Sequence, residues 1–355
     1  MPRVGSRQRK ALELKIVHRF YDLLIGGAEV VILHTARALA EHEHVLIFSR
    51  YARSWISDSL SELPNVRLLR IDPTEASTSI AQQNADLHCF HYYPPMSESD
   101  FRNLPSRVLS STVIVNHWHT ELPLILGAKY VFLSEESRNQ TGVNIPFSSG
   151  CVLINPVDTS FFDIRRTPLR HTVGRHSRAV SIKFSDDFFV VAEAIQPSRL
   201  TMMVLGSLPK LVDYVGANVR RLANSYWFLP FGSLRVTEFL RYPEIYLYQT
   251  RHDFAETCPM NILEAMAAGV PIVAERKGGI IDLIKHGESG MLCDDRDDFV
   301  NYSNRLFDDE TARKRIADCA QQWAFDHASL SRYGAKFLQA MDTLFAISLS
   351  KNIGQ

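Results

Sequence analysis

The segment ETCPMNILEAMAAGVPIVA (residues 256–274) predicts a loop, a helix, a tight turn and a buried strand in immediate succession. Pro259 suits the first turn of a helix, because the N–H group that it lacks would have no helical partner there. Gly269 suits the left-handed residue that ends a helix, and Pro271 prevents the helix from continuing. The apolar run 270–275 then predicts a strand. Short helices that lead directly into buried strands are typical of parallel α/β sheets.

The predicted helix offers a site for an anionic ligand that carries hydroxyl groups. Its amino end presents unpaired N–H groups and a partial positive charge, which favour a phosphate. Glu256 precedes the helix and Glu264 lies a turn and a half inside it, so the two carboxylates reach different depths of one ligand. A ribose at one glutamate and a hexose at the other would explain the spacing. Two solvated glutamates on a capped surface helix would explain it equally well.

The rest of the chain alternates short β-branched runs with helical patterns, which predicts parallel βαβ units. The stretch 155–172 carries two prolines and several charges, and we interpret it as a linker between two domains. We expect one domain over 1–165 and a second over 166–332, with a C-terminal helix of about 333–355 that packs back on the first. Each domain is predicted to be a doubly wound, Rossmann-like sheet, whose ligands bind beyond the carboxyl ends of the strands.

The boundaries of the elements follow from these patterns. The predicted strands are 14–21, 44–50, 66–71, 85–92, 111–118, 129–134 and 151–155 in the first domain, and 201–206, 225–232, 244–250, 270–275 and 289–294 in the second. The predicted helices are 28–42, 185–195, 234–242 and 280–287, followed by a long helical tail from Asp298 that breaks near 326–329.

Composition excludes several classes of protein. The 355 residues are 46% hydrophobic and 22% charged, as in soluble globular proteins, and are enough for about two domains. The formal net charge is +0, so no overall field attracts nucleic acid or anionic lipid. We find no apolar run long enough to span a membrane, and the basic start of the chain lacks the apolar region of a signal peptide. Five scattered cysteines without a CxxC pair fit reduced thiols, so we predict a cytoplasmic protein.

Glu256 and Glu264, followed by AMAAGVP (265–271), resemble the signature of the retaining GT-B glycosyltransferases, glycosyltransferase family 4. The segments that resemble the family's other motifs, in the family's order, are GGAEVV (26–31) for the glycine loop, NPVDTSFF (155–162) for the linker, VGRHSR (173–178) for the Gly-Arg segment and RKGGIIDLIKHGESGML (276–292) for the Gly-Gly loop. The linker has Pro156 where the family usually has glycine. The resemblance spans nearly the whole chain and implies a GT-B fold, in which two Rossmann-like domains face a central cleft. It implies that 1–165 is the acceptor-binding domain and 166–332 the donor-nucleotide-binding domain.

The resemblance implies a donor-binding role for each matching residue. Glu264 would bind the ribose of a nucleotide sugar, and Glu256 would contact its hexose. The backbone of Met260, Asn261, Ile262 and Leu263 would hold the distal phosphate.

Cations would neutralise the diphosphate in this resemblance. The Gly-Arg arginine is Arg175, and the family's usual spacing would put the lysine at Val180. Lys183 is the nearest lysine, with Arg178 as a substitute. A fixed pair of cations stabilises a departing diphosphate without a metal ion.

The first domain contributes further candidates. Gly26 and Gly27 would let the backbone approach a phosphate and the acceptor, or they form a plain strand-to-helix turn. The family often places a histidine where this chain has His117 and His119, so either would touch the donor sugar. A zinc site that joins this pair to the cluster 88–91 is the competing hypothesis, but no four-ligand spacing emerges.

The reaction implied is transfer of a hexose from a nucleoside-diphosphate sugar, with UDP-sugar favoured, to a hydroxyl acceptor with retained configuration. In the family's usual front-face route the leaving phosphate accepts the acceptor's proton, so we expect no side-chain base, no metal and no cofactor. The sequence accordingly shows neither a Ser-His-Asp constellation nor paired glycosidase carboxylates. Another GT-B sugar-nucleotide enzyme, such as an epimerase, and a non-catalytic sugar-nucleotide-binding protein remain alternatives. The expected partners are the donor and a small-molecule or glycan acceptor, not nucleic acid, and nothing indicates membrane association.

Overall fold

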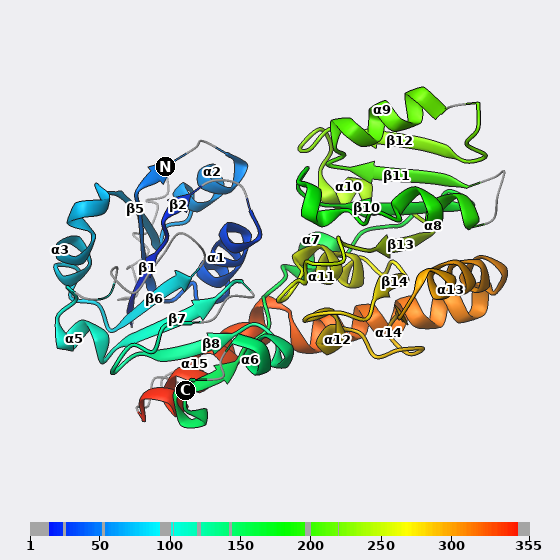
Figure 1. Cartoon of the computed structure of the whole chain (residues 1–355). Helices are drawn as coiled ribbons and strands as arrows, with labels where there is room; N and C mark the ends of the chain where they lie inside the picture. The colour runs from blue at the N-terminus through cyan, green and yellow to red at the C-terminus, as the bar shows by residue number, and fades with distance from the viewer. Residues whose placement is uncertain are drawn as a thin grey trace, which may run out of the picture. The chain divides into compact units, whose positions relative to one another are not determined.

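The computed structural model describes residues 14–23, 26–51, 54–92, 101, 103–118, 122–141, 144–195, 200–218 and 220–346. The chain divides into two compact units, which Figure 1 shows in colour order along the chain. The first comprises Met1–Val115 and Pro123–Tyr130, and the second comprises Asn116–Leu122 and Val131–Gln355. The domain boundaries at 165 and 332 and the return of the C-terminal helix stay predictions.

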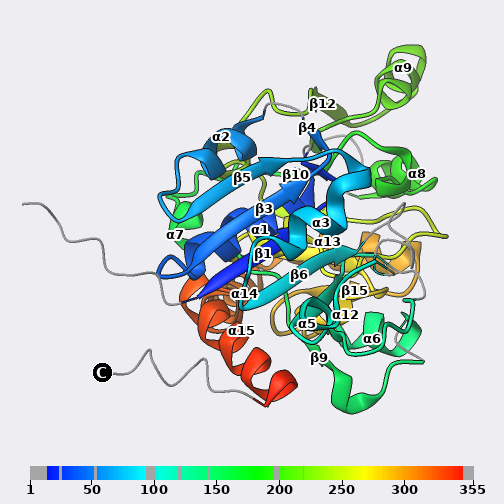
Figure 2. The ribbon, with the colours of Figure 1, turned by 90° about the vertical axis from the view of Figure 1, so that its left-hand side faces the viewer.

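Seven strands form one sheet in the order β5-β3-β1-β6-β7-β8-β9, and Figure 2 shows β5, β3, β1 and β6 side by side. The strands are β1 Lys15–Arg19, β3 Glu43–Phe48, β5 Val66–Arg70, β6 Leu87–Tyr92, β7 Thr112–Asn116, β8 Lys129–Phe132 and β9 Gly150–Val152. The pairs that join β5, β3, β1 and β6 are parallel. A separate pair joins β2 Asp22–Leu23 to β4 Arg50–Tyr51.

The helices between these strands are α1 Gly27–Ala38, α2 Trp55–Ser61, α3 Ala76–Ala81, α5 Ser106–Leu109 and α6 Glu135–Thr141, with short 3-10 turns at η1 Pro73–Glu75 and η2 Phe147–Ser149. Helix α1 ends four residues before the predicted boundary at 42. The side chain of Asn65 donates to the carbonyl of Ala36, in the last turn of the helix, at 3.1 Å, which gives an unpaired carbonyl a partner outside the helix. It also donates to the carbonyl of His42, beyond the end of the helix, at 3.2 Å.

Six strands form the second sheet in the order β12-β11-β10-β13-β14-β15, and all neighbouring strands in it are parallel. The strands are β10 Thr172–His176, β11 Thr201–Leu205, β12 Ser225–Leu229, β13 Ile245–Tyr248, β14 Ile272–Glu275 and β15 Met291–Cys293. The two predicted parallel sheets are therefore confirmed. The central strand β10 was predicted only as a motif, because Gly174 and Arg175 weaken the strand signal. A Cβ on Gly174 would lie 2.2 Å from the Pro243 ring, so close packing explains the glycine.

The helices and turns of this part are α7 Thr159–Phe162, η3 Ser181–Lys183, α8 Phe188–Ala194, α9 Pro209–Asn218, α10 Val236–Phe239, α11 Met260–Ala267, α12 Ile280–Leu283, α13 Arg296–Asp308, α14 Glu310–His327 and α15 Leu330–Phe345. The predicted break near 326–329 is confirmed between α14 and α15. A second break at Asp309 was not predicted: its side chain accepts the N–H of Ala312 at 2.8 Å and so begins a new helix. Helix α9 was also missed. Helix α15 packs against β9.

The strand order of the second sheet places its binding edge. The chain builds outward from β10 through β11 to β12, and then returns to the other side of β10 with β13. In open parallel sheets, ligands bind at such a reversal, beyond the carboxyl ends of the strands. The residues at these ends, Arg175 and His176 on β10 and Tyr246 and Tyr248 on β13, therefore form the floor of a candidate site.

Candidate active site

The loop between β13 and α11 carries Glu256, and two glycines fix its backbone. Gly279 donates its N–H to the carbonyl of Glu256 at 2.7 Å. A Cβ on Gly279 would lie 1.7 Å from the carbonyl oxygen of Thr257, and one on Gly278 would lie 2.5 Å from that of Glu256. Gly278 also has a φ of +56°, which disfavours other residues. The Gly-Gly loop therefore requires glycine because it packs directly beneath the Glu256 loop.

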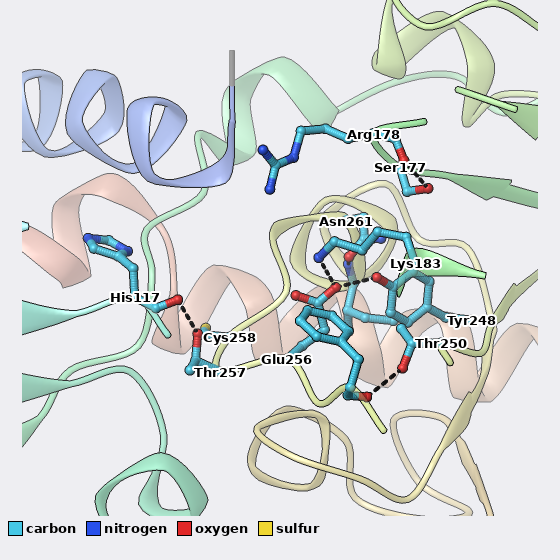
Figure 3. Close-up of polar contacts among 12 residues, drawn as sticks. His117, Ser177, Arg178, Lys183, Tyr248, Thr250, Glu256, Thr257, Cys258 and Asn261 are labelled. Carbon is cyan, nitrogen blue, oxygen red and sulfur yellow. Dashed lines mark hydrogen bonds and ion pairs between the residues drawn. The ribbon is translucent and has the colours of Figure 1, made fainter. Parts of the chain in front are cut away.

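The Glu256 carboxylate is mostly buried and held by two donors. Its Oε1 accepts hydrogen bonds from the Nζ of Lys183 and the hydroxyl of Tyr248, as Figure 3 shows. Burial by itself raises the pKa of Glu256, but the Lys183 charge, both hydrogen bonds and the Arg178 charge outweigh it and lower the pKa. Glu256 thus stays an anion inside the site, where it can accept hydrogen bonds from a sugar.

Lys183 lies in the turn η3, and Arg175 of β10 forms a hydrogen bond with the backbone of that turn. The Nη2 of Arg175 donates to the carbonyl of Lys183, and its Nη1 donates to the carbonyl of Gln249 at 3.1 Å. The guanidinium has no exposed surface and lies 4.2 Å from the centre of the Phe184 ring. Burial lowers its pKa, and the nearby tyrosines and glutamates act in the opposite direction. Arg175 therefore links η3 to the end of β13, and its two amino groups already donate to backbone carbonyls.

Arg178 is placed differently from Arg175. It is exposed just beyond β10, and Figure 3 shows its side chain extending away from the strand. Its charge contributes to the lowered pKa of Glu256, so it acts on the same region as Lys183. Of the two arginines, Arg178 is the one whose guanidinium can meet a ligand from solvent.

Glu264 is paired with a histidine that the sequence did not single out. The Nε2 of His176 lies 2.7 Å from Oε2 of Glu264, and both side chains are mostly buried. The hydroxyl of Tyr246 lies 3.0 Å from the Nδ1 of the same imidazole. Asn261 on the first turn of α11 donates to the carbonyl of His176 at 3.0 Å. Helix α11 is thus tied to β10 at both of these positions.

The amino end of α11 has no side-chain cap. The hydroxyl of Thr257, two residues before the N-cap residue Pro259, donates to the carbonyl of His117 at 3.3 Å. Cys258 accepts the N–H of Asn155 through Sγ at 3.4 Å, and its carbonyl accepts from the Asn155 side chain. At the other end, Gly269 has a φ of +65°, which confirms the predicted left-handed end.

Four further predicted residues follow one another on this helix. Met260 and Asn261 are partly exposed, whereas Ile262 and Leu263 have no exposed surface. The N–H groups of the last two lie 3.2 and 3.3 Å from the carbonyl of Pro259, which they share as acceptor.

The remaining candidates are placed separately. His117 follows β7 and is partly buried, and desolvation lowers the pKa of its side chain to about 4. His119 lies outside the described residues. Gly26 precedes α1 with an extended φ of −165°, and Gly27 is the first residue of the helix. Both belong to the first unit, and neither has the positive φ that would require glycine.

The alternative zinc site is not supported by the described part of the chain, in which no group of three or more His, Cys, Asp or Glu side chains could hold a metal ion. His88 turns to the hydroxyl of Ser111 at 2.9 Å, whereas His91 turns to His18 at 3.1 Å. Within the same residues, no helix is long and apolar enough to cross a membrane. All five cysteines are free thiols.

Three residues of the site were not predicted, His176, Tyr246 and Tyr248, and all three lie at or near the carboxyl end of a central strand. Tyr246 and Tyr248 alternate along β13, so both point to the same face of the sheet, just before the Glu256 loop. His176 follows Arg175 at the end of β10. The acidic residue of the Gly-Gly loop, Asp282, has a structural task instead: its Oδ2 accepts the N–H of Glu135 at 2.7 Å, at the amino end of α6.

Comparison with known proteins agrees with this architecture. Residues 217–323, from α9 into α14, match the family model of glycosyl transferases group 1. N-acetyl-alpha-D-glucosaminyl L-malate synthase of Bacillus anthracis is 33% identical over 73 residues, which are 20% of this chain and 19% of that protein. D-inositol 3-phosphate glycosyltransferase of Stackebrandtia nassauensis is 33% identical over 88 residues, 23% of this chain and 20% of that protein. The matches thus span about a fifth of each relative's length.

Similar solved structures cover nearly the whole chain. HepE of Anabaena in complex with UDP and glucose has a TM-score of 0.71 at 17% identity, covering 93% of this chain and 100% of that one. A glycosyltransferase of Rickettsia africae has a TM-score of 0.74 at 15% identity, covering 93% and 98%. At these identities the likeness establishes the fold, which is GT-B.

Proposed function

We propose that this protein transfers a hexose from a nucleoside-diphosphate sugar to a hydroxyl acceptor with retained configuration. The proposal is supported by the match of residues 217–323 to the family model of glycosyl transferases group 1 and by the GT-B fold of the two sheets. The observation that carries the proposal is the arrangement around α11. A buried anion, Glu256, precedes the uncapped amino end of the helix, and a second carboxylate, Glu264, follows inside it.

Glu264 would accept hydrogen bonds from the ribose hydroxyls, and Glu256 from the hexose. Only Oε2 of Glu264 has a partner among the described residues, which leaves Oε1 for a ligand. The N–H groups at the start of α11 would hold the distal phosphate, because a helix amino end favours an anion. The two glutamates would then divide the donor between them.

Lys183 and Arg178 would neutralise the diphosphate as it leaves. A lysine ammonium has three donors, and one of those of Lys183 goes to Glu256, so others remain for phosphate oxygens. Arg175 was predicted to contact the diphosphate directly. Because its amino groups donate to the backbone at η3 and β13, we assign it to the positioning of Lys183.

These cations supply the charge that a metal ion would otherwise supply, so the proposed reaction is independent of metal and cofactor. The leaving phosphate would accept the proton of the acceptor, and no side-chain base is needed. His117 or His119 would touch the donor sugar. We further propose that 1–165 binds the acceptor, with Gly26 and Gly27 near it, that 166–332 binds the donor, and that the protein works in the cytoplasm with its thiols reduced. UDP is the favoured nucleotide, supported by the complex of HepE with UDP and glucose.

A thermal-shift panel of UDP, GDP and ADP tests the proposal. We expect UDP to raise Tm most, because a ligand that binds only the folded state stabilises it by mass action. Glu264→Gln should abolish most of that shift, and radiolabelled UDP-hexose with candidate acceptors should then report transfer. If none of the three nucleotides raises Tm, the chain does not bind a nucleotide sugar in this site. Binding without transfer to any acceptor would favour the sugar-nucleotide-binding alternative, and conversion of one UDP-hexose into another would favour the epimerase.

A further inference from the structure

His176 lies between two groups that fix its tautomer. An ionised carboxylate can only accept a hydrogen bond, so the Nε2 that faces Glu264 at 2.7 Å must carry the proton. In a neutral imidazole the Nδ1 is then an acceptor. The hydroxyl of Tyr246 lies 3.0 Å from it and can donate, because burial raises the pKa of Tyr246 and keeps its proton in place. Tyr246, His176 and Glu264 therefore form a directed row of hydrogen bonds.

The packing around His176 holds this row in place. The backbone N–H of His176 donates to the Tyr246 hydroxyl at 3.1 Å, so that one oxygen serves both the main chain and the ring. The ring of Phe239, which has no exposed surface, meets the imidazole edge-on at 6.0 Å. Asn261 and Glu264 lie three residues apart, on one face of α11, and both contact His176. These contacts hold the imidazole between Tyr246 and Glu264, although the Tyr246 hydroxyl also lies 3.2 Å from the carbonyl of His176 as a second acceptor.

We propose that His176, oriented by Tyr246, is a positioning residue that fixes the Glu264 carboxylate with one oxygen turned to the ligand, and thereby determines selection of a ribose over sugars without vicinal hydroxyls. This rests on the proposed function, in which Glu264 receives the ribose. A carboxylate whose Oε2 is already engaged can rotate little, so Oε1 keeps the direction that the hydroxyls need. Without His176 the side chain of Glu264 gains rotamers, and ordering it on binding weakens affinity.

Titration calorimetry with UDP and with 2′,3′-dideoxy-UDP tests this role. His176→Leu keeps an apolar side chain of similar size without a donor. This substitution should lower the affinity for UDP about tenfold, as expected for one charge-assisted hydrogen bond, and leave the affinity for the dideoxy nucleotide unchanged. His176→Gln places an amide N–H near the position of Nε2 and should restore most of the affinity. Tyr246→Phe removes the donor to Nδ1 and should give a smaller loss with the same preference between the ligands.

A double-mutant cycle separates positioning from a merely structural role. In the Glu264→Gln background, His176→Leu should have little further effect on UDP, because its action passes through the carboxylate. Equal losses for both nucleotides, or an undiminished effect in that background, would overturn the proposal. If His176→Leu does not fold, as judged by circular dichroism, Tyr246→Phe and His176→Gln decide the outcome by the same comparison of ligands. A wild-type protein that binds none of UDP, GDP and ADP would refute the proposed function first, and the role of His176 with it.

Discussion

Strands β1, β3 and β6 of the first unit bury three histidines in a row, whereas the segments that follow β10 and β13 in the second unit bring together mostly buried groups of opposite charge. In the first unit His91, His18 and His44 are all buried, with 3.1 Å between His91 and His18 and 2.9 Å between His18 and His44. The last imidazole reaches the carbonyl of Leu39 at 3.2 Å. Because that carbonyl can only accept, each ring in turn donates through Nε2, and His18 and His44 accept through Nδ1.

The second unit pairs ions instead. Glu256 forms an ion pair with Lys183, and the guanidinium of Arg175 donates to the backbone carbonyl of Lys183 in η3. The histidine row needs no counter-charge, and burial lowers the pKa of His18 well below its usual range. The ionic cluster keeps its charges because each has a partner, and removing one partner leaves the other buried and alone. A neutral row is thus sensitive to acid, and a charged cluster is sensitive to substitution.

Lys183→Met should have the largest effect. Methionine keeps the length of the side chain but leaves Glu256 without its cation, which costs about 3–5 kcal/mol of unfolding free energy for a buried pair. Loss of a preorganised charge should also lower kcat by about 10²–10³. Urea denaturation and steady-state kinetics measure both effects. Lys285→Met is the matched control, because its pair with Glu288 is exposed, and it should leave stability nearly unchanged. Similar losses of stability in the two variants would contradict the contrast.

The two arginines should separate stability from turnover. Arg175→Ala leaves the carbonyls of Lys183 and Gln249 without their donors, at a cost of about 1–3 kcal/mol each. Arg178→Ala should leave the denaturation midpoint unchanged and lower kcat by about tenfold or more, since its exposed charge would act on the diphosphate. Urea denaturation and steady-state kinetics again measure the two effects. A stable Arg175→Ala variant, or an Arg178→Ala variant with normal kcat, would reverse our assignment.

Acid should destabilise the first unit through its histidines. The pKa of His44 is lowered from 6.5 to about 4, mainly by burial, so the unfolded chain binds more protons between these values. The stability is therefore complete above about pH 6.5 and is lost as the pH falls towards 4, by about 3 kcal/mol for this residue alone. Hydrogen exchange of peptides from β1 and β3 would locate the loss. In His44→Phe this pH dependence should be shallower, and an unchanged slope would exclude the row as its source.

Substitution of the two glutamates should affect the binding of different parts of the donor. Glu264→Gln removes the charge that faces the ribose and should weaken the binding of UDP by about 1.5–3 kcal/mol, or roughly 10- to 150-fold in affinity. Glu256→Gln should leave UDP nearly unaffected but weaken the intact UDP-hexose and lower kcat. Titration calorimetry of both variants with both ligands gives the comparison. If Glu256→Gln weakens UDP as much as Glu264→Gln does, the two residues do not share the donor in this way.

Chelation should have the smallest effect. If the cations of the second unit do the work of a metal, activity after treatment with EDTA should equal that before it. Activity that disappears in EDTA and returns only with Mn²⁺ would show that the charged cluster is insufficient.

The sequence predicted the elements whose signals are local. Gly269 ends α11 because only a left-handed residue closes that turn at low cost, and the apolar runs of β11, β13 and β14 identify buried strands. Strand β10 was missed because Gly174 and Arg175 weaken its local signal. The groups that accommodate them, the Pro243 ring and the carbonyls of Lys183 and Gln249, are brought there by the tertiary structure. The break at Asp309 was missed because the helical periodicity continues through it.

The sequence by itself determined the two parallel sheets, the order of their motifs and the two glutamates of α11, because periodicity, prolines and glycines act within a few residues. Only the tertiary structure decided the partners of those glutamates. Lys183 meets Glu256 across 73 positions of the chain, and His176 meets Glu264 across 88. Such pairs depend on the register that places the ends of β10 and β13 side by side beneath α11. The same packing surrounds Arg175 with aromatic rings. The sequence predicted that Arg175 contacts the diphosphate, but we assign it to positioning Lys183 because the fold buries its side chain completely, and burial depends on the whole sheet.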